Sequence, residues 1–176
     1  MQELYSHCKG TFQHSLRVAK NSYDFACYLG INNADRLLVL GAFHDIGKTR
    51  ISPSLLNKQK QLTNIEFSEI KRHTEYGEEI LKKYPQFSSN DSDVILFHHE
   101  NIDGSGYFGK KEEEIPFDSK IIRIIDSFDT MLYGRIYQKP VYRDDIIKEF
   151  NTLSGHHYDK NLIKEFIKLL ERKTFL

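Results

Sequence analysis

The sequence predicts an all-α protein, a single-domain helical bundle of about six or seven helices. Apolar residues recur at steps of three and four in several segments, as on one face of a helix, and no segment alternates apolar and polar residues as a half-buried strand does. The 176 residues are enough for one domain with one buried core. We therefore expect residues 1–176 to form one domain, with a core at about 11–172.

Two helices are predicted in the first quarter of the chain. From Thr11, apolar side chains at Phe12, Leu16 and Ala19 continue to Ala26 at helical spacing, and Leu29-Gly30 supplies a stop. Asn33 is a candidate cap for a second helix, which runs to about His44 with little polar surface and ends before Gly47. The segment 49–61 contains Pro53 and several lysines, so we expect an exposed connection with at most a short helix.

A third long helix is predicted from Thr63 to about Tyr84. Thr63 and Glu66 match the capping box that opens a helix, and Pro85 stops it. After a polar loop, a short buried helix at 94–97 leads into the pair His98-His99. The following loop, 101–116, is rich in glycine and charge.

The last third of the chain predicts three more helices. The first runs from Ser119 to about Tyr137 and carries many isoleucines, interrupted by Asp126 and Asp129 on one side. Two shorter helices are expected at about 143–153 and 160–172, separated by turn residues.

Composition restricts the class of protein. The 25 basic and 25 acidic residues give a formal net charge of zero, which argues against binding a nucleic-acid polymer through bulk charge. No apolar run approaches the ~18 residues that span a membrane, and the N-terminus lacks the layout of a signal peptide. The two cysteines are too few for a disulfide framework. We therefore expect a cytoplasmic protein without a membrane partner.

Seven residues stand out as candidate metal ligands, because each lies at or near the inward face of a predicted helix: His14, His44, Asp45, His73, His98, His99 and Asp126. Each has an ordinary alternative. His44-Asp45 could be a helix cap, His73 a core histidine, and Asp126 a salt-bridge partner of Arg17 or Arg123. A buried carboxylate, however, costs several kcal/mol unless it is paired or binds a metal.

The seven candidates together indicate a metal centre. Imidazoles with carboxylates and no thiolates suit Fe, Mn, Zn or Ni better than Mg or Ca, which prefer oxygen ligands. Seven donors are more than one ion needs. Asp45 could bridge two ions ~3.5 to 4 Å apart, the spacing of two-metal hydrolases.

The ordered motifs resemble the HD-GYP family, the branch of the HD metal-dependent phosphohydrolases associated with hydrolysis of cyclic di-GMP. The resemblance covers most of the chain and includes His14-Ser15-Leu16-Arg17-Val18, His44-Asp45-Ile46-Gly47-Lys48, His73-Thr74-Glu75-Tyr76-Gly77, His98-His99-Glu100, Asp103-Gly104-Ser105-Gly106-Tyr107, and Ile125-Asp126-Ser127-Phe128-Asp129. A histidine-aspartate pair alone implies only the wider superfamily. The histidine pair followed by the glycine-rich loop implies this branch.

The resemblance implies a role for each matched position. His14, His44, Asp45 and Asp126 would hold a first metal ion, and His73, His98 and His99 a second, with Asp45 bridging. Lys48 and Arg135 would contact substrate phosphate, as a point charge and a planar fork. Asp129 would orient a ligand or touch the site, with a helix salt bridge as the alternative. Catalytic roles then fall to Asp45, Lys48 and Asp129.

The remaining substrate contacts are expected at Gly106, Tyr107, Phe108 and Gln138, where the chain also departs from the family pattern. Phe108 replaces the proline of the GYP motif, so the loop is looser or gains a stacking surface. Tyr107 and Phe108 either stack on a base or pack the loop onto the body. Gln138 stands where a second basic residue is often found. Gly10 replaces a glutamate that adds a third ion in some members, which favours two ions.

The resemblance implies a phosphodiesterase that converts cyclic di-GMP to linear pGpG, or further to GMP, by attack of a metal-bridging hydroxide. The cofactors would be two divalent transition-metal ions, Fe or Mn ahead of Zn or Ni. A diguanylate cyclase or a separate sensor protein is the expected protein partner, since the chain has no room for a sensor domain. Two alternatives remain: an HD-type phosphohydrolase for another cyclic or linear dinucleotide, and a non-catalytic module that binds cyclic di-GMP or docks a cyclase.

Overall fold

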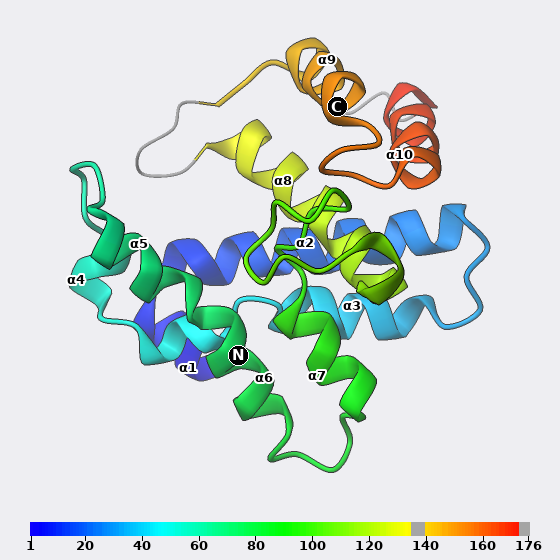
Figure 1. The fold of residues 1–176 in the computed structure, drawn as a ribbon. Helices are drawn as coiled ribbons and strands as arrows, with labels where there is room; N and C mark the ends of the chain where they lie inside the picture. The colour runs from blue at the N-terminus through cyan, green and yellow to red at the C-terminus, as the bar shows by residue number, and fades with distance from the viewer. Residues whose placement is uncertain (135–139, 173–176) are drawn as a thin grey trace.

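Helix α2, Lys9–Tyr28, runs through the middle of the computed structural model (Figure 1). The structure describes residues 1–134 and 140–172. On one side α2 packs along α3, Ala34–Phe43, and on another it contacts α8, Phe117–Tyr133. Its buried face includes Val18, Phe25 and Ala26, which have no exposed surface. The long helix predicted from the spacing of apolar residues is confirmed.

The other helices surround this centre. Helices α6 and α7 pack against each other below α2 and α3, whereas α9 and α10 lie together above α8 (Figure 1). The remaining bounds are α1 Gln2–His7, a 3-10 turn η1 Ile46–Arg50, α4 Pro53–Leu56, α5 Asn64–Lys71, α6 His73–Leu81, α7 Ser89–Leu96, a 3-10 turn η2 Glu112–Glu114, α9 Arg143–Leu153 and α10 Lys160–Arg172.

Helix α8 supplies much of the core. Its isoleucines Ile121, Ile122, Ile124 and Ile125 have no exposed surface, and they join the buried side chains of α2, α7, α9 and α10 in one cluster. Within the described residues the regular elements are all helical, apart from an isolated bridge between Ser154 and Tyr158. The predicted all-α fold is confirmed.

The third predicted helix is two helices. The capping box is present, because Thr63 Oγ1 accepts from the Glu66 N–H at 3.3 Å and Glu66 Oε2 accepts from the Thr63 N–H at 2.8 Å. The single helix predicted at 63–84 is nevertheless wrong, since α5 ends at Lys71 and α6 begins at His73. α6 packs tightly on η1 and α7, whereas α5 buries no residue. Tertiary packing therefore sets the break, which local sequence preference does not reveal.

Further boundaries differ from the prediction. α7 begins at Ser89, ahead of the helix predicted at 94–97, because Ser88 and Asp91 form a capping box. α8 ends at Tyr133, before the predicted end at Tyr137, because Gly134 takes a left-handed conformation with φ +72. Residues 135–139 lie outside the described part. The unpredicted helix α1 buries Leu4 completely, so the core begins before residue 11. With the short helix α4 and the split at Arg72, the described chain has more helices than the six or seven expected.

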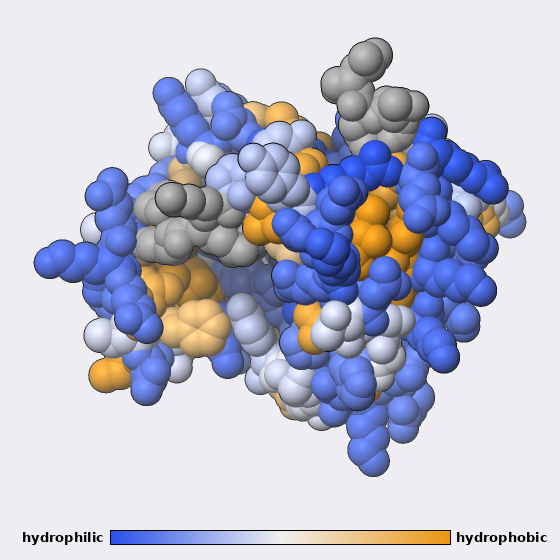
Figure 2. All heavy atoms as spheres, turned by 90° about the horizontal axis from the view of Figure 1, so that it is seen from above, coloured by the Kyte–Doolittle hydropathy of each residue, from blue (hydrophilic) through white to orange (hydrophobic). Residues whose placement is uncertain are grey.

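The surface is largely polar. Figure 2 shows one face covered mainly by hydrophilic side chains and hollowed near its centre, with apolar areas gathered in recesses. Among the helices that the structure describes, none combines the length and the apolar character needed to cross a membrane.

Candidate metal centre

All seven predicted ligands meet at one place in the structure. α2 carries His14, the end of α3 carries His44 and Asp45, α6 begins with His73, and α8 carries Asp126. The pair His98-His99 follows α7. Their ligand atoms form three overlapping groups, each within 4.8 Å: His73 with His98 and His99, His14 with His44 and Asp126, and His44 with Asp45 and His98.

Three histidines are fixed in the same orientation by their own backbone. The Nδ1 atoms of His44, His73 and His98 lie 2.7, 2.7 and 2.6 Å from the carbonyl oxygens of Gly41, Ile70 and Ile95. In each case the carbonyl belongs to the residue three positions earlier. A carbonyl oxygen only accepts, so Nδ1 carries the proton and Nε2 presents a lone pair. The fold therefore fixes the tautomer that a metal ligand needs.

Asp45 lies between the two histidine groups and has 1% of its surface exposed. Its Oδ2 is 3.4 Å from His44 Nε2 and 3.9 Å from His14 Nε2, whereas its Oδ1 is 3.3 Å from His73 Nε2. Each carboxylate oxygen thus faces a different group of imidazoles. This is the placement that a bridging carboxylate requires.

The charge of Asp45 is maintained despite its burial. Burial alone would raise its pKa, but neighbouring positive charge, first of all the Lys48 ammonium, holds the pKa well below the ordinary value. Lys48 Nζ lies 2.5 Å from Asp45 Oδ2 and is itself nearly buried. Lys48 therefore contacts the predicted bridging carboxylate directly, on the oxygen that faces His14 and His44.

The second histidine group is neutral. Burial lowers the pKa of His73 to about 4, and burial with neighbouring imidazoles lowers the pKa of His98 and His99 well below the ordinary value. A neutral imidazole is the form that binds a metal ion. These three residues are therefore ready ligands near neutral pH.

His14 is held from both sides. Its Nε2 lies 2.9 Å from Asp126 Oδ1, and its Nδ1 lies 2.7 Å from Asp129 Oδ2. Burial would lower the pKa of His14, but the hydrogen bonds to Asp126 and Asp129 outweigh it and raise the pKa. Asp129 also accepts from Arg17 Nε at 2.7 Å and Nη2 at 2.8 Å. The Arg17 salt bridge considered for Asp126 is thus made by Asp129.

Asp129 has the position of an orienting residue. Histidine ligands of metals commonly donate their second ring N–H to a carboxylate, which fixes the ring. Burial would raise the pKa of Asp129, but hydrogen bonds from His14 and Arg17 lower it, so the carboxylate stays ionised. Asp129 is therefore placed to orient His14.

Gly47 explains how the segment after His44-Asp45 reaches α6. A Cβ atom at this position would lie 1.9 Å from the carbonyl oxygen of His73 and 2.5 Å from the backbone nitrogen of Gly77. Only glycine allows η1 and α6 to approach this closely. Gly47 therefore brings the segment that follows Asp45 up to the start of α6 at His73.

The donor set fits divalent transition-metal ions. His44 Nε2 and Asp45 Oδ1 are buried atoms without a hydrogen-bond partner, and an unpartnered buried acceptor is costly. Lone pairs from imidazoles and a carboxylate, aimed at a common space, are what such an ion would satisfy. The observation supports metal binding here, and the ligand sets named above are the residues that would hold the ions.

The glycine-rich loop is held beside the predicted ligands by Glu100. This buried carboxylate accepts from the backbone N–H of Phe108 at 2.8 Å and of Lys110 at 2.7 Å. Gly106 passes so close that a Cβ there would lie 2.5 Å from Glu100 Cα. Proline at position 108 would have no N–H to donate. Phenylalanine therefore provides a tether that proline lacks.

The two loop aromatics point to different neighbours. The Tyr107 ring packs on the His99 ring with centroids 4.7 Å apart, and Lys71 Nζ lies 4.8 Å above it. Phe108 packs edge-on against Phe97 at 5.8 Å and is 41% exposed. Tyr107 is thus beside a predicted ligand, whereas Phe108 packs the loop onto the body.

We expect Phe108→Pro to have a free energy of unfolding about 1 to 3 kcal/mol lower than that of Phe108→Ala, because the buried Glu100 carboxylate loses the backbone N–H of residue 108. Phe108→Ala is the matched control, since it removes the same ring but keeps the N–H. Urea unfolding of both variants measures the difference. Equal or greater stability of the proline variant would contradict the tether.

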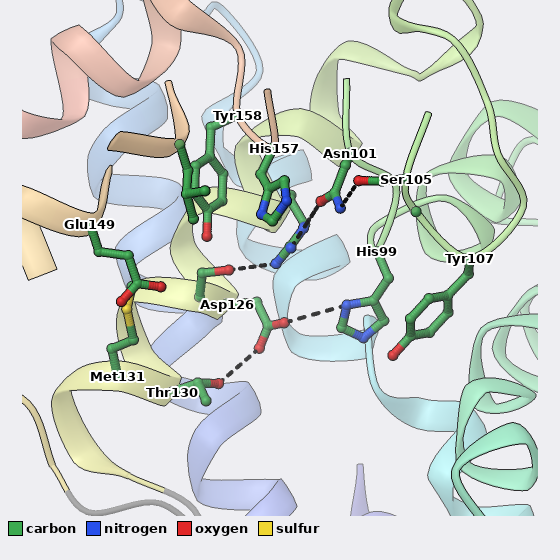
Figure 3. A pocket seen from close by; sticks show the side chains of 14 residues that line it. His99, Asn101, Ser105, Tyr107, Asp126, Thr130, Met131, Glu149, His157 and Tyr158 are labelled. Carbon is green, nitrogen blue, oxygen red and sulfur yellow. Dashed lines mark hydrogen bonds and ion pairs between the residues drawn. The ribbon is translucent and has the colours of Figure 1, made fainter. Parts of the chain in front are cut away.

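A cavity of about 380 Å³ opens beside the metal centre. His99 and Asp126 line it on the metal side, and Tyr107 stands next to His99 (Figure 3). Glu149 and Met131 lie on the opposite side from Asn101 and Ser105 (Figure 3). Of the predicted substrate contacts, Gly106 and Tyr107 line the cavity, whereas Phe108 is not among its lining residues.

Several lining residues were not predicted from the sequence as part of a site. Arg123 was considered only as a salt-bridge partner of Asp126, and Asn101, Glu149 and Tyr158 had no assigned role. The available signal was Arg123 itself, a cation within the isoleucine-rich segment and three residues before Asp126. Arg135 and Gln138, predicted to contact substrate, lie outside the described residues.

The sequence of this chain is similar to those of known proteins. The family model described as HD domain matches residues 1–162. The chain belongs to the HD domain family. The predicted resemblance is thereby confirmed.

Curated relatives of this HD domain are phosphodiesterases by name. It is 35% identical over 168 residues to "Cyclic di-GMP phosphodiesterase" of Thermotoga maritima, covering 93% of this chain and 46% of that protein. It is 31% identical over 158 residues to "3'3'-cGAMP-specific phosphodiesterase 2" of Vibrio cholerae, covering 88% and 30%. The chain thus spans less than half the length of these relatives.

Solved structures share the fold. A protein from Bdellovibrio bacteriovorus, titled "Bd1817, a HDG"Y"P protein", superposes with a TM-score of 0.73 at 20% identity, over 91% of this chain and 52% of that chain. The phosphodiesterase PgpH HD domain of L. monocytogenes, in complex with cyclic-di-AMP, superposes with a TM-score of 0.68 at 24% identity, over 99% and 98%.

Proposed function

We propose that this HD domain is a metal-dependent phosphodiesterase that hydrolyses cyclic di-GMP to linear pGpG. The observation that carries the proposal is Asp45, whose two oxygens face separate groups of histidines. The relatives named as cyclic di-GMP phosphodiesterases support the choice of substrate. We further propose that the cofactors are two ions of Fe or Mn per chain, with Zn or Ni as alternatives.

The roles of the chain's own residues follow from their positions. His14, His44 and Asp126 would hold one ion and His73, His98 and His99 the other, with Asp45 shared. Bound ions of this kind lower the pKa of a coordinated water to about 7 and neutralise phosphate charge. Lys48, beside Asp45 Oδ2, is placed to bind a non-bridging phosphate oxygen once substrate enters. On the family resemblance alone, we assign Arg135 and Gln138, which lie outside the described residues, to the same phosphate.

Hydrolysis of cyclic di-GMP requires that one ribose–phosphate ester be cut and a second remain. Tyr107, packed on His99, and Gly106 line the cavity where the rest of the dinucleotide would lie. The cavity is within the size range of small-molecule sites. We place the reaction in the cytoplasm, where a diguanylate cyclase or a sensor protein would be the partner.

The test combines metal analysis with product analysis. Protein reconstituted anaerobically with Mn or Fe is expected to contain about two ions per chain and to convert cyclic di-GMP to pGpG. Mass spectrometry measures the metal content, and chromatography identifies the products. Chelation is expected to abolish turnover, and adding back the metal to restore it. Binding of cyclic di-GMP without turnover in the fully loaded protein would refute the proposal.

A further inference from the structure

Arg123 on α8 is a cation held by neutral partners. Its Nε and Nη2 donate to Asn101 Oδ1 at 3.2 and 3.0 Å, and its Nη1 donates to Ser127 Oγ at 2.5 Å. Its guanidinium also lies 5.3 Å from the centroid of the buried Tyr158 ring. Within residues 1–134 and 140–172, Arg123 has no carboxylate partner. These contacts fix the plane of the guanidinium without neutralising its charge.

The hydrogen bonds leave one edge of Arg123 for a ligand. A guanidinium has five N–H donors, and these bonds use three of them. The remaining two lie one on Nη1 and one on Nη2, the two nitrogens at the end of the side chain. Such a pair binds two adjacent acceptors, as in a phosphate, a carboxylate, or the O6 and N7 atoms of guanine.

The cavity that Arg123 lines decides between these acceptors. It is shared with His99 and Asp126, so a group bound there lies next to the metal centre. Glu149 also lines it, on the side opposite Asn101 (Figure 3). A second phosphate here would face two carboxylates. Guanine instead offers acceptors to Arg123 and N–H donors, on its other edge, to an acid such as Glu149.

We propose that Arg123 binds the O6 and N7 atoms of a guanine base in the substrate and selects guanine over adenine. This inference rests on the proposed cyclic dinucleotide hydrolysis and names the residue that sets its base preference. Adenine presents an N6 donor in place of the O6 acceptor, so it cannot accept both N–H groups. The packed Tyr158 ring and the Asn101 carbonyl fix the arginine for this contact.

The test compares Arg123→Met with Arg172→Met on three substrates. Arg172 is the matched control, because its guanidinium also lies over a tyrosine ring, at 5.5 Å from Tyr28, and it does not line the cavity. For Arg123→Met we expect kcat/KM for cyclic di-GMP to fall by about 10- to 100-fold. Hydrolysis of cyclic di-AMP and of base-free bis(p-nitrophenyl) phosphate is expected to change by no more than about twofold.

Other outcomes would overturn the inference. Equal losses on cyclic di-GMP and cyclic di-AMP, with bis(p-nitrophenyl) phosphate unaffected, would mean that Arg123 binds phosphate. Losses on all three substrates, with less bound metal, would mean a structural role.

A separate measurement keeps the two proposals distinguishable. Calorimetric binding of GMP and of AMP to the metal-loaded protein tests Arg123 without turnover. We expect GMP to bind more tightly than AMP, and Arg123→Met to remove the difference. If the wild-type protein shows this preference but hydrolyses no dinucleotide, the proposed function fails and the inference stands. If it hydrolyses cyclic di-GMP without the preference, the inference fails alone.

Discussion

Asp45→Ala is expected to reduce metal content from about two ions per chain to fewer than one, and to lower cyclic di-GMP hydrolysis by at least about a thousandfold. The reason is that each oxygen of Asp45 faces a different histidine group, so the change removes one ligand from both. Loss of several kcal/mol of charge stabilisation corresponds to this factor. Metal analysis and product chromatography on the same sample measure both effects.

The control for this change is Asp35→Ala. Asp35 is an exposed aspartate in the first turn of α3, whereas Asp45 follows the other end of that helix. The Asp35→Ala variant should keep full metal content and activity. Retention of two ions and of hydrolysis in Asp45→Ala would exclude a bridging role, and His44→Ala should fail in the same two assays if the site is as described.

Asp129→Asn is expected to weaken binding at the His14 side of the site by about 10- to 100-fold, the usual effect of losing the partner of a histidine ligand. The introduced asparagine has a single acceptor oxygen, whereas Asp129 offers two oxygens to His14 Nδ1 and the Arg17 guanidinium. The group of His73, His98 and His99 is untouched. A titration with limiting metal should therefore show one ion bound nearly normally and the other weakly.

Arg17→Met separates orientation from simple ion pairing. This variant removes the ion pair of Asp129 but leaves its contact with His14. We expect it to reduce folding stability while metal affinity changes much less than in Asp129→Asn. If both variants weaken metal binding equally, the ion pair and not the histidine contact is what matters.

The ligand set was predictable because its residue types are chemically specific. Asp126 in an isoleucine-rich helix and His73 among apolar residues are costly unless something partners them, and the periodicity shows that both face inward. The helices that carry them were predicted from the same apolar pattern. Position and chemistry together therefore predicted which side chains meet.

Other features depend on contacts that no local pattern encodes. The break at Arg72 arises because α6 packs on η1 and α7 while α5 packs on little, although the sequence reads as one helix. The role of Glu100 depends on the backbone of Phe108 and Lys110, and backbone donors leave no trace in residue type. Arg123 was interpreted as a salt-bridge partner of Asp126. Its contact in the structure is Asn101, which is 22 residues away in the sequence and therefore not visible in a local pattern.

The distribution of the predicted ligands along the chain would also link metal binding to folding. His14 and Asp126 lie far apart in the sequence, and the remaining ligands come from three intervening segments. Ions held by all of them would cross-link α2, α6 and α8 with the ends of α3 and α7. A ligand that binds only the folded state adds about 2.7 kcal/mol of stability at a hundred times its Kd. The metal supply of the cell would then set how long the folded protein persists as well as how fast it works.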